Sequence, residues 1–86
     1  MICETITIRN TTGLHTRPAK RVVDEAKKFE SDIIVRYREK EASLKSLLKI
    51  LKLGISYGHE IEIQCEGSDE ILAMEKIKSF ILNLEE

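Results

Sequence analysis

One short segment of the sequence combines side chains that could accept and hold a phosphoryl group. Residues 13–19 read GLHTRPA, so His15, Arg17 and Pro18 lie close together. A neutral imidazole nitrogen is a competent nucleophile near neutral pH, because an unperturbed histidine titrates at about 6.5. The N–H groups of a helix start and the Arg17 guanidinium would both donate hydrogen bonds to phosphoryl oxygens. This chemistry requires neither a metal ion nor a separate general acid.

The spacing of apolar residues predicts a helix directly after His15. The apolar face of this helix consists of Ala19, Val22, Val23, Ala26 and Phe29. We therefore expect a helix over residues 17–29. Pro18 suits the first turn, where a missing N–H group costs nothing, and the Thr16 hydroxyl could cap the first amide groups or contact a phosphate. Taken alone, a histidine beside a helix cap is most often only a surface residue.

Alternating apolar residues predict strands on both sides of this helix. One face of three strands consists of Ile2, Ile6 and Ile8, then Ile33, Val35 and Tyr37, and then Ile61, Ile63 and Cys65. The segment of residues 38–42 is short enough to form a turn that leads from the second strand into a further strand. Because each strand is half polar, one face of the sheet is expected to be open to solvent.

Two further helices complete the predicted order. Leu47, Leu48, Ile50 and Leu51 predict a short helix that ends at Gly54, and Ala73, Ile77, Phe80, Ile81 and Leu84 predict a longer one near the C-terminus. The order βαββαβα is typical of an α+β, open-faced two-layer sandwich, with an antiparallel four-stranded sheet and three helices on one face. We expect a single domain over residues 1–86, because the chain is too short for two cores.

Composition excludes several classes of function. Lys and Arg number 14 and Asp and Glu number 15, a formal net charge of -1 that argues against a general nucleic-acid binder. No apolar run approaches the roughly 18 residues needed to cross a bilayer. The N-terminal residues lack the basic and then apolar plan of a signal peptide, so we expect a cytoplasmic protein without membrane insertion.

The cysteines and His59 do not form a metal-binding pattern. Cys3 and Cys65 lie far apart, and their parity in the predicted strands places them on opposite faces of the sheet, so we expect two reduced thiols. His59 has no second ligand near it in the sequence and is interpreted as a solvated loop residue. The glycines match neither of the common nucleotide-binding loops, and we expect no metal and no cofactor.

The phosphoryl-binding segment and several later landmarks closely resemble the HPr family. The landmarks are LKS at 44–46, LGI at 53–55, Gly58 followed by Glu60 and Ile61, and Gly67 followed by Asp69 and Glu70. HPr is the histidine-containing phosphocarrier of the bacterial phosphoenolpyruvate-dependent sugar phosphotransferase system. The resemblance spans essentially the whole chain without gaps.

This resemblance implies a phosphocarrier without turnover of its own. His15 would accept a phosphoryl group from the first enzyme of that system, itself charged by phosphoenolpyruvate, and pass it to sugar-specific components. Arg17 matches the arginine of the family that stabilises the phosphate. The resemblance also implies the HPr-like sandwich and a monomer, and it places a partner-docking surface on the second helix, at Leu47, Leu48, Lys49, Leu51 and Lys52.

Ser46 leaves a second function open. It matches the serine that a dedicated kinase phosphorylates in many Gram-positive relatives, and a phosphate would be favoured at a helix start. On the residues alone, the Ser46 hydroxyl could simply be a helix cap. The alternative to a phosphocarrier is an HPr-like regulatory paralogue that acts mainly through Ser46 and protein partners such as a transcription regulator. The presence of both His15 and Arg17 favours the carrier.

Overall fold

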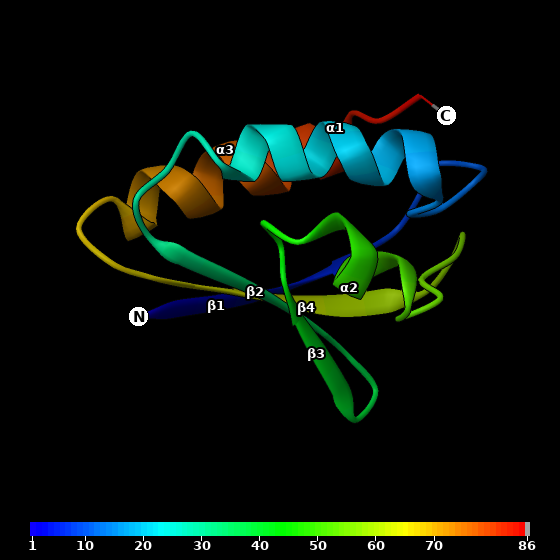
Figure 1. Cartoon of the computed structure of the whole chain (residues 1–86), viewed down its shortest axis with the longest axis horizontal. Coiled ribbons are helices and arrows are strands. Elements are labelled where there is room, and N and C mark those ends of the chain that lie inside the picture. The colour runs from blue at the N-terminus through cyan, green and yellow to red at the C-terminus, as the bar shows by residue number, and fades with distance from the viewer. Residues whose placement is uncertain (86) are drawn as a thin grey trace.

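The alternating strands assemble into one antiparallel sheet, as predicted. The computed structural model describes residues 1–85, which form four strands in the order β1-β4-β2-β3 and three helices (Figure 1). Along the chain the elements are β1 (Ile2–Thr7), α1 (Thr16–Ala26), β2 (Asp32–Tyr37), β3 (Lys40–Ser43), α2 (Leu47–Leu51), β4 (Glu60–Glu66) and α3 (Glu70–Leu82). All three strand pairs are antiparallel. The prediction of an α+β, open-faced sandwich is confirmed.

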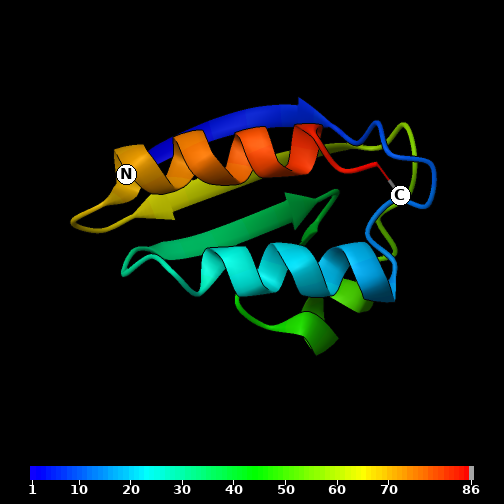
Figure 2. The ribbon, with the colours of Figure 1, turned by 90° about the horizontal axis from the view of Figure 1, so that it is seen from above.

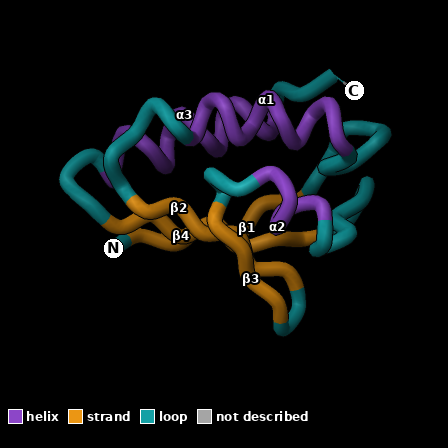
Figure 3. Tube along the Cα trace, in the orientation of Figure 1, coloured by secondary structure: helices purple, strands orange, loops and turns teal. Residues whose placement is uncertain are grey.

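The helices cover one face of the sheet and bury its apolar rows. Figures 2 and 3 show α1 and α3 side by side above the strands, with the shorter α2 beside α1. The buried side chains that the strands contribute include Ile6, Ile33, Val35, Tyr37, Ile61, Ile63 and Cys65, and those from the helices include Val22, Val23, Ile50, Ala73, Met74, Ile77 and Ile81. Met74 belongs to this core although the sequence reading left it out. The other face of the sheet carries the polar residues of each strand.

The two cysteines lie where strand parity placed them. Cys3 is exposed, Cys65 is fully buried, and both are free thiols within the described residues. Burial raises the pKa of the Cys65 thiol to about 11, because the thiolate would lose its hydration in the core. Cys65 therefore acts as a packing residue at neutral pH.

The first helix differs from its predicted bounds. It begins at Thr16 and ends at Ala26, whereas residues 17–29 were expected. After Ala26 the chain tightens, because Lys28 donates to the carbonyl of Glu25 and Phe29 donates to that of Ala26 over only three residues. Phe29 lies beyond the end of α1 but still packs against the core. Its apolar side chain therefore continued the spacing that predicted the helix.

Figure 2 shows the loop before β2 and the loop before α3 at the end of the molecule opposite the start of α1. A carboxylate holds these two loops together. Asp69 accepts hydrogen bonds from the backbone N–H groups of Glu30 and Ser31, both at 2.9 Å, and from the Ser31 hydroxyl. Gly67 packs against Ser31 so closely that a Cβ atom would lie 2.6 Å from the Ser31 Cα atom. These contacts tie the chain before β2 to the chain before α3.

Backbone contacts join the loops at the other end, where His15 lies. The N–H group of Leu14 donates to the carbonyl of Ile55 at 3.0 Å, and the buried side chain of Asn10 donates to the carbonyl of Gly13 at 2.7 Å. Gly13 has φ +64 and lies against Ser56, where a Cβ atom would come within 2.5 Å of the Ser56 Cα atom. Only glycine fits this position, because both the backbone angle and the contact exclude a side chain.

We predict that Asp69→Ala lowers the melting temperature by several degrees at pH 7. Hydrogen bonding by Ser31 is the main cause that lowers the pKa of Asp69 below its ordinary 3.8. A lowered pKa in the folded state adds stability above the unfolded pKa, and this stability is lost as the pH falls through the folded value. The difference in melting temperature between wild type and variant should therefore shrink between pH 5 and pH 3. If circular dichroism gives the same difference in melting temperature across that range, the ionised form of Asp69 is not what holds the two loops together.

We also predict that Gly13→Ala destabilises the fold more than Gly54→Ala does. Gly54 has φ +69, close to that of Gly13, but nothing lies within 4 Å of a Cβ atom there. In both variants the left-handed backbone conformation of the new alanine lowers the free energy of unfolding by about 1–2 kcal/mol. Gly13→Ala should lose about 1–3 kcal/mol more, as is typical of overpacking. Urea unfolding measures both free energies, and equal losses would show that the contact with Ser56 is unimportant.

Candidate functional site

His15 is the residue that caps the N-terminus of α1. Its backbone is extended, with φ -76 and ψ 179, and its carbonyl accepts the first helical hydrogen bond from Ala19 at 2.9 Å. The His15 side chain is exposed. The prediction that Thr16 is the cap is wrong, because the helix begins one residue earlier than expected and Thr16 is its first residue. The His15 side chain itself makes no capping hydrogen bond to the described N-terminus of α1.

The first turn of α1 has the electrostatic character of an anion site. The amide groups of Thr16 and Arg17 precede the first helical hydrogen bond and point out of the helix end, whereas Pro18 has no N–H group. The first turn of this fully described helix carries no acidic side chain that would offset the positive end of the helix dipole. Pro18 lies in this first turn, as expected, and it is buried.

His15 borders two hollows at this end of the molecule. The larger, of about 550 Å³, is lined by Thr11, Thr12, His15, Thr16, Arg17, Pro18, Ser56 and Tyr57. The smaller, of about 350 Å³, is lined by Leu14, His15, Thr16, Leu51, Gly54, Ile55 and Ser56. The structure therefore brings His15, Thr16 and Arg17 together around one hollow, and Thr16 stays a candidate for phosphate contact.

Ser56 and Tyr57 form the wall of the larger hollow that the sequence reading missed. Both come from the loop between α2 and β4, far from His15 along the chain, and Tyr57 is 66% exposed. Gly54 and Gly58 on either side mark this segment as a loop. Nothing local in the sequence indicates that the loop faces His15.

Ser46 lies at the start of α2 and borders neither hollow. It is half-buried and stands in the capping position, where its carbonyl accepts from Ile50 and its N–H group donates to Ser43, both at 3.1 Å. Its hydroxyl makes no capping hydrogen bond within the described part of the chain, so the interpretation of Ser46 as a side-chain cap is wrong. α2 is five residues long.

The surface of α2 carries an apolar and cationic group of side chains next to the smaller hollow. Leu48 is 65% exposed, Lys49 and Lys52 are exposed, and Leu51 lines the hollow together with His15. Leu47 is half-buried against the core. We call Leu47, Leu48, Lys49, Leu51 and Lys52 the α2 surface. The nearby Lys45 does not add to it, because its ammonium group donates to the carbonyl of Phe29 at 2.7 Å.

His59 is not the solvated loop residue that the sequence reading expected. It is half-buried, and its ring stacks on the ring of Tyr37 with a centroid distance of 4.8 Å and an interplanar angle of 17°. Its Nδ1 atom accepts a hydrogen bond from the N–H group of Ser56 at 3.0 Å. Among residues 1–85, no group of three or more potential ligands could hold a metal ion.

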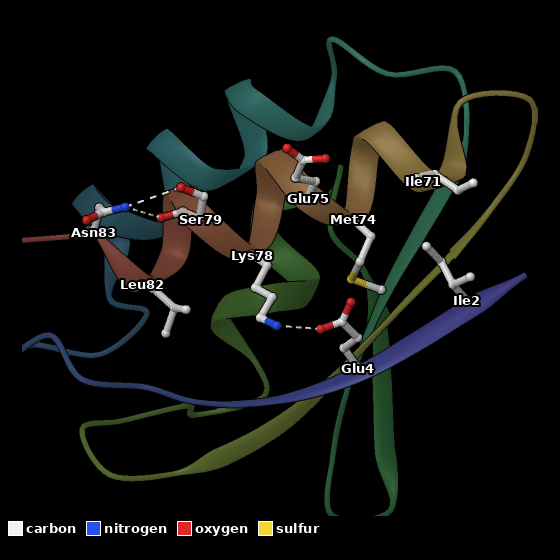
Figure 4. A pocket seen from close by; sticks show the side chains of 9 residues that line it. All are labelled: Ile2, Glu4, Ile71, Met74, Glu75, Lys78, Ser79, Leu82 and Asn83. Atoms are coloured by element: carbon white, nitrogen blue, oxygen red, sulfur yellow. Dashed lines mark hydrogen bonds and ion pairs between the residues drawn. The ribbon is translucent and has the colours of Figure 1, made fainter.

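A separate groove of about 530 Å³ lies between β1 and α3 (Figure 4). Ile2, Met74 and Leu82 supply apolar lining, and Lys78 pairs with Glu4 across it. Its lining shares no described residue with the hollows at His15. It offers no nucleophile comparable to His15.

No helix in the described residues is long and apolar enough to cross a membrane.

Comparisons with known proteins show which family the chain resembles. Residues 2–83 match the family model for the PTS HPr component phosphorylation site. The chain is 47% identical over 73 residues to the phosphocarrier protein HPr of Buchnera aphidicola, and this match covers 85% of this chain and 86% of that protein. It is also 43% identical over 82 residues to the multiphosphoryl transfer protein of Haemophilus influenzae; the match covers 92% of this chain but only 16% of that protein.

Solved structures share the fold over nearly the whole chain. An HPr structure from Thermoanaerobacter tengcongensis is 40% identical with a TM-score of 0.92, and the match covers 95% of this chain and 92% of that one. Crh, the catabolite repression containing protein of Bacillus subtilis, crystallised as a swapped dimer, is 31% identical with a TM-score of 0.78; the match covers 100% and 99%. The chain thus belongs to the HPr family of phosphocarrier proteins of the phosphotransferase system.

Proposed function

We propose that this chain carries a phosphoryl group on His15 between two proteins of a phosphotransferase system. One observation carries the proposal: the exposed imidazole of His15 lies at the N-terminus of α1, in the same hollow as Arg17. The donor is the first enzyme of the system, charged by phosphoenolpyruvate, and the acceptors are its sugar-specific components. The match to a multiphosphoryl transfer protein supports this choice of partners.

The chemistry follows from the helix end. The unprotonated nitrogen of the His15 imidazole attacks the phosphorus atom, a nitrogen–phosphorus bond forms, and the bond to the donor breaks. The attacking nitrogen holds no proton, so the step needs no general base. The amide groups of the first turn and the Arg17 guanidinium donate to the phosphoryl oxygens as charge passes to the carrier. In the second transfer a nucleophile of the acceptor attacks the phosphorus atom, the nitrogen–phosphorus bond breaks, and its electron pair returns to the imidazole of His15.

The α2 surface is where the partner enzymes dock. An exposed Leu48 flanked by Lys49 and Lys52 offers apolar area at its centre and positive charge around it. Leu51 connects this surface to the hollow at His15. An enzyme that covers the α2 surface therefore also covers His15 and excludes water from the reaction.

A second candidate function is regulation through Ser46. The structural likeness to Crh and the position of Ser46 beside the α2 surface favour it. A serine kinase would then add a phosphate at Ser46, and a transcription regulator would recognise the phosphorylated form. The carrier function ranks first, because His15 and Arg17 line one hollow at the start of α1.

We predict that His15 is the phosphorylated residue. Incubation with the first enzyme and phosphoenolpyruvate should give an acid-labile, alkali-stable adduct on the wild type and on His59→Ala, but none on His15→Ala, because only His15 lies at the helix end. Intact-protein mass spectrometry at alkaline pH measures the adduct. If the wild type stays unlabelled with an active first enzyme from the same organism, the carrier function is refuted.

We further predict that Ser46→Asp slows the charging of His15 without lowering stability. A carboxylate at a helix start is favoured by about 0.3–1 kcal/mol, so the melting temperature should stay or rise. The same charge offsets the positive α2 surface and weakens docking, most strongly at low salt. Ser46→Ala is the matched control and should change neither property, since the hydroxyl makes no capping bond. If His15 in Ser46→Asp is charged at the wild-type rate at low salt, Ser46 plays no regulatory role.

A further inference from the structure

We infer that His59 is a positioning residue for phosphoryl transfer at His15, and that it acts through Ser56. This inference rests on the proposed function, because it concerns the rate of charging of His15. His59 itself lines neither hollow at His15, so any effect it has must pass through a neighbour.

The ring of His59 is held in place by the end of β2. It stacks on Tyr37, a buried residue at the last position of that strand. The guanidinium carbon of Arg38 lies over the Tyr37 ring at 5.0 Å from its centroid. Arg38 has φ 59, a left-handed conformation that turns the chain immediately after Tyr37. These contacts fix the orientation of the imidazole on the sheet, although its own loop is near the surface.

The orientation matters because Nδ1 is used as an acceptor. The N–H group of Ser56 donates to Nδ1 of His59 at 3.0 Å, while the N–H group of His59 donates to the carbonyl of Ser56 at 3.1 Å. The second bond could be made by any residue at position 59 except proline, but the first requires a side-chain acceptor at this distance from the backbone. The bond also assigns the proton of the neutral ring to Nε2. Position 59 thus closes the turn over residues 56–59 from both sides.

The same turn forms one wall of the phosphoryl site. Ser56 borders both hollows at His15. Its Cα atom lies against Gly13, and the carbonyl of the preceding Ile55 accepts from Leu14 at 3.0 Å. A shift of Ser56 therefore moves a wall of the hollows and disturbs the backbone that leads into His15. Direct contacts lead from Tyr37 to His59, from His59 to Ser56, and from Ser56 to Gly13, which precedes His15 by two residues.

Two substitutions separate the acceptor from the ring. His59→Phe keeps an aromatic ring beside Tyr37 but removes the acceptor. His59→Asn removes the ring but places an amide oxygen where Nδ1 was. We expect His59→Phe to reduce kcat/KM for charging of His15 by the first enzyme about three- to tenfold, as for the loss of one hydrogen bond that orients the site, and His59→Asn to restore most of it. In ¹H–¹⁵N spectra, the Ser56 amide proton should move upfield in His59→Phe and stay near its wild-type position in His59→Asn.

Asp69→Ala is the control for stability, because it loosens the opposite end of the molecule. Measured well below both melting temperatures, it should charge at the wild-type rate. The inference is wrong if His59→Phe charges like the wild type, if His59→Asn is slowed as much as His59→Phe, or if Asp69→Ala is slowed equally. In each of these cases a charged wild type leaves the carrier function intact. A wild type that is never charged refutes the carrier function and the positioning role together.

Discussion

The backbone of Gly13 and Leu14 packs directly on the backbone of Ile55 and Ser56, and the place of His15 depends on that contact. Gly13 makes it possible, since any side chain there would collide with Ser56. The hydrogen bond from Leu14 to Ile55 then sets the register of the two loops. His15 follows immediately, in an extended conformation that starts α1. The histidine is thus held by the tertiary structure on one side and by a helix on the other, which preorganises it for reaction.

The N-termini of the two longer helices show why one of them can receive an anion. α3 already carries carboxylates at its start: Asp69 holds the neighbouring loop, and Glu70 accepts from Gly67 and pairs with the N-terminal amine at 2.7 Å. The bond to that amine is the main cause that lowers the pKa of Glu70. The fully described first turn of α1 carries no such group, which suits the phosphoryl group that we propose is bound there. A helix N-terminus thus binds carboxylates that stabilise the fold at one end of the molecule, and in the proposed function it binds the phosphoryl group at the other.

Local patterns in the sequence predicted most of the framework and the centre of the site. Strand alternation placed Cys3 and Cys65 on opposite faces, and residues 13–19 identified His15 and Arg17 at a helix start. Errors arose where local rules compete, because Thr16 is a good cap residue but the extended His15 takes that position. The wall formed by Ser56 and the stacking of His59 on Tyr37 come from segments distant in sequence. No periodicity or motif reports such contacts, since they depend on how loops distant in sequence meet in the folded chain.

The most direct test of the account is a map of amide chemical shifts before and after charging by the first enzyme. If the phosphoryl group is bound at the start of α1 within an unchanged fold, the largest shifts fall on Thr16 and Arg17, with smaller ones at Ser56. The amides of Glu30 and Ser31, which bind Asp69 at the other end, should not move. Unchanged Thr16 and Arg17 resonances in a fully charged sample, or shifts spread over the whole sheet, would contradict the claim that this helix end holds the phosphoryl group.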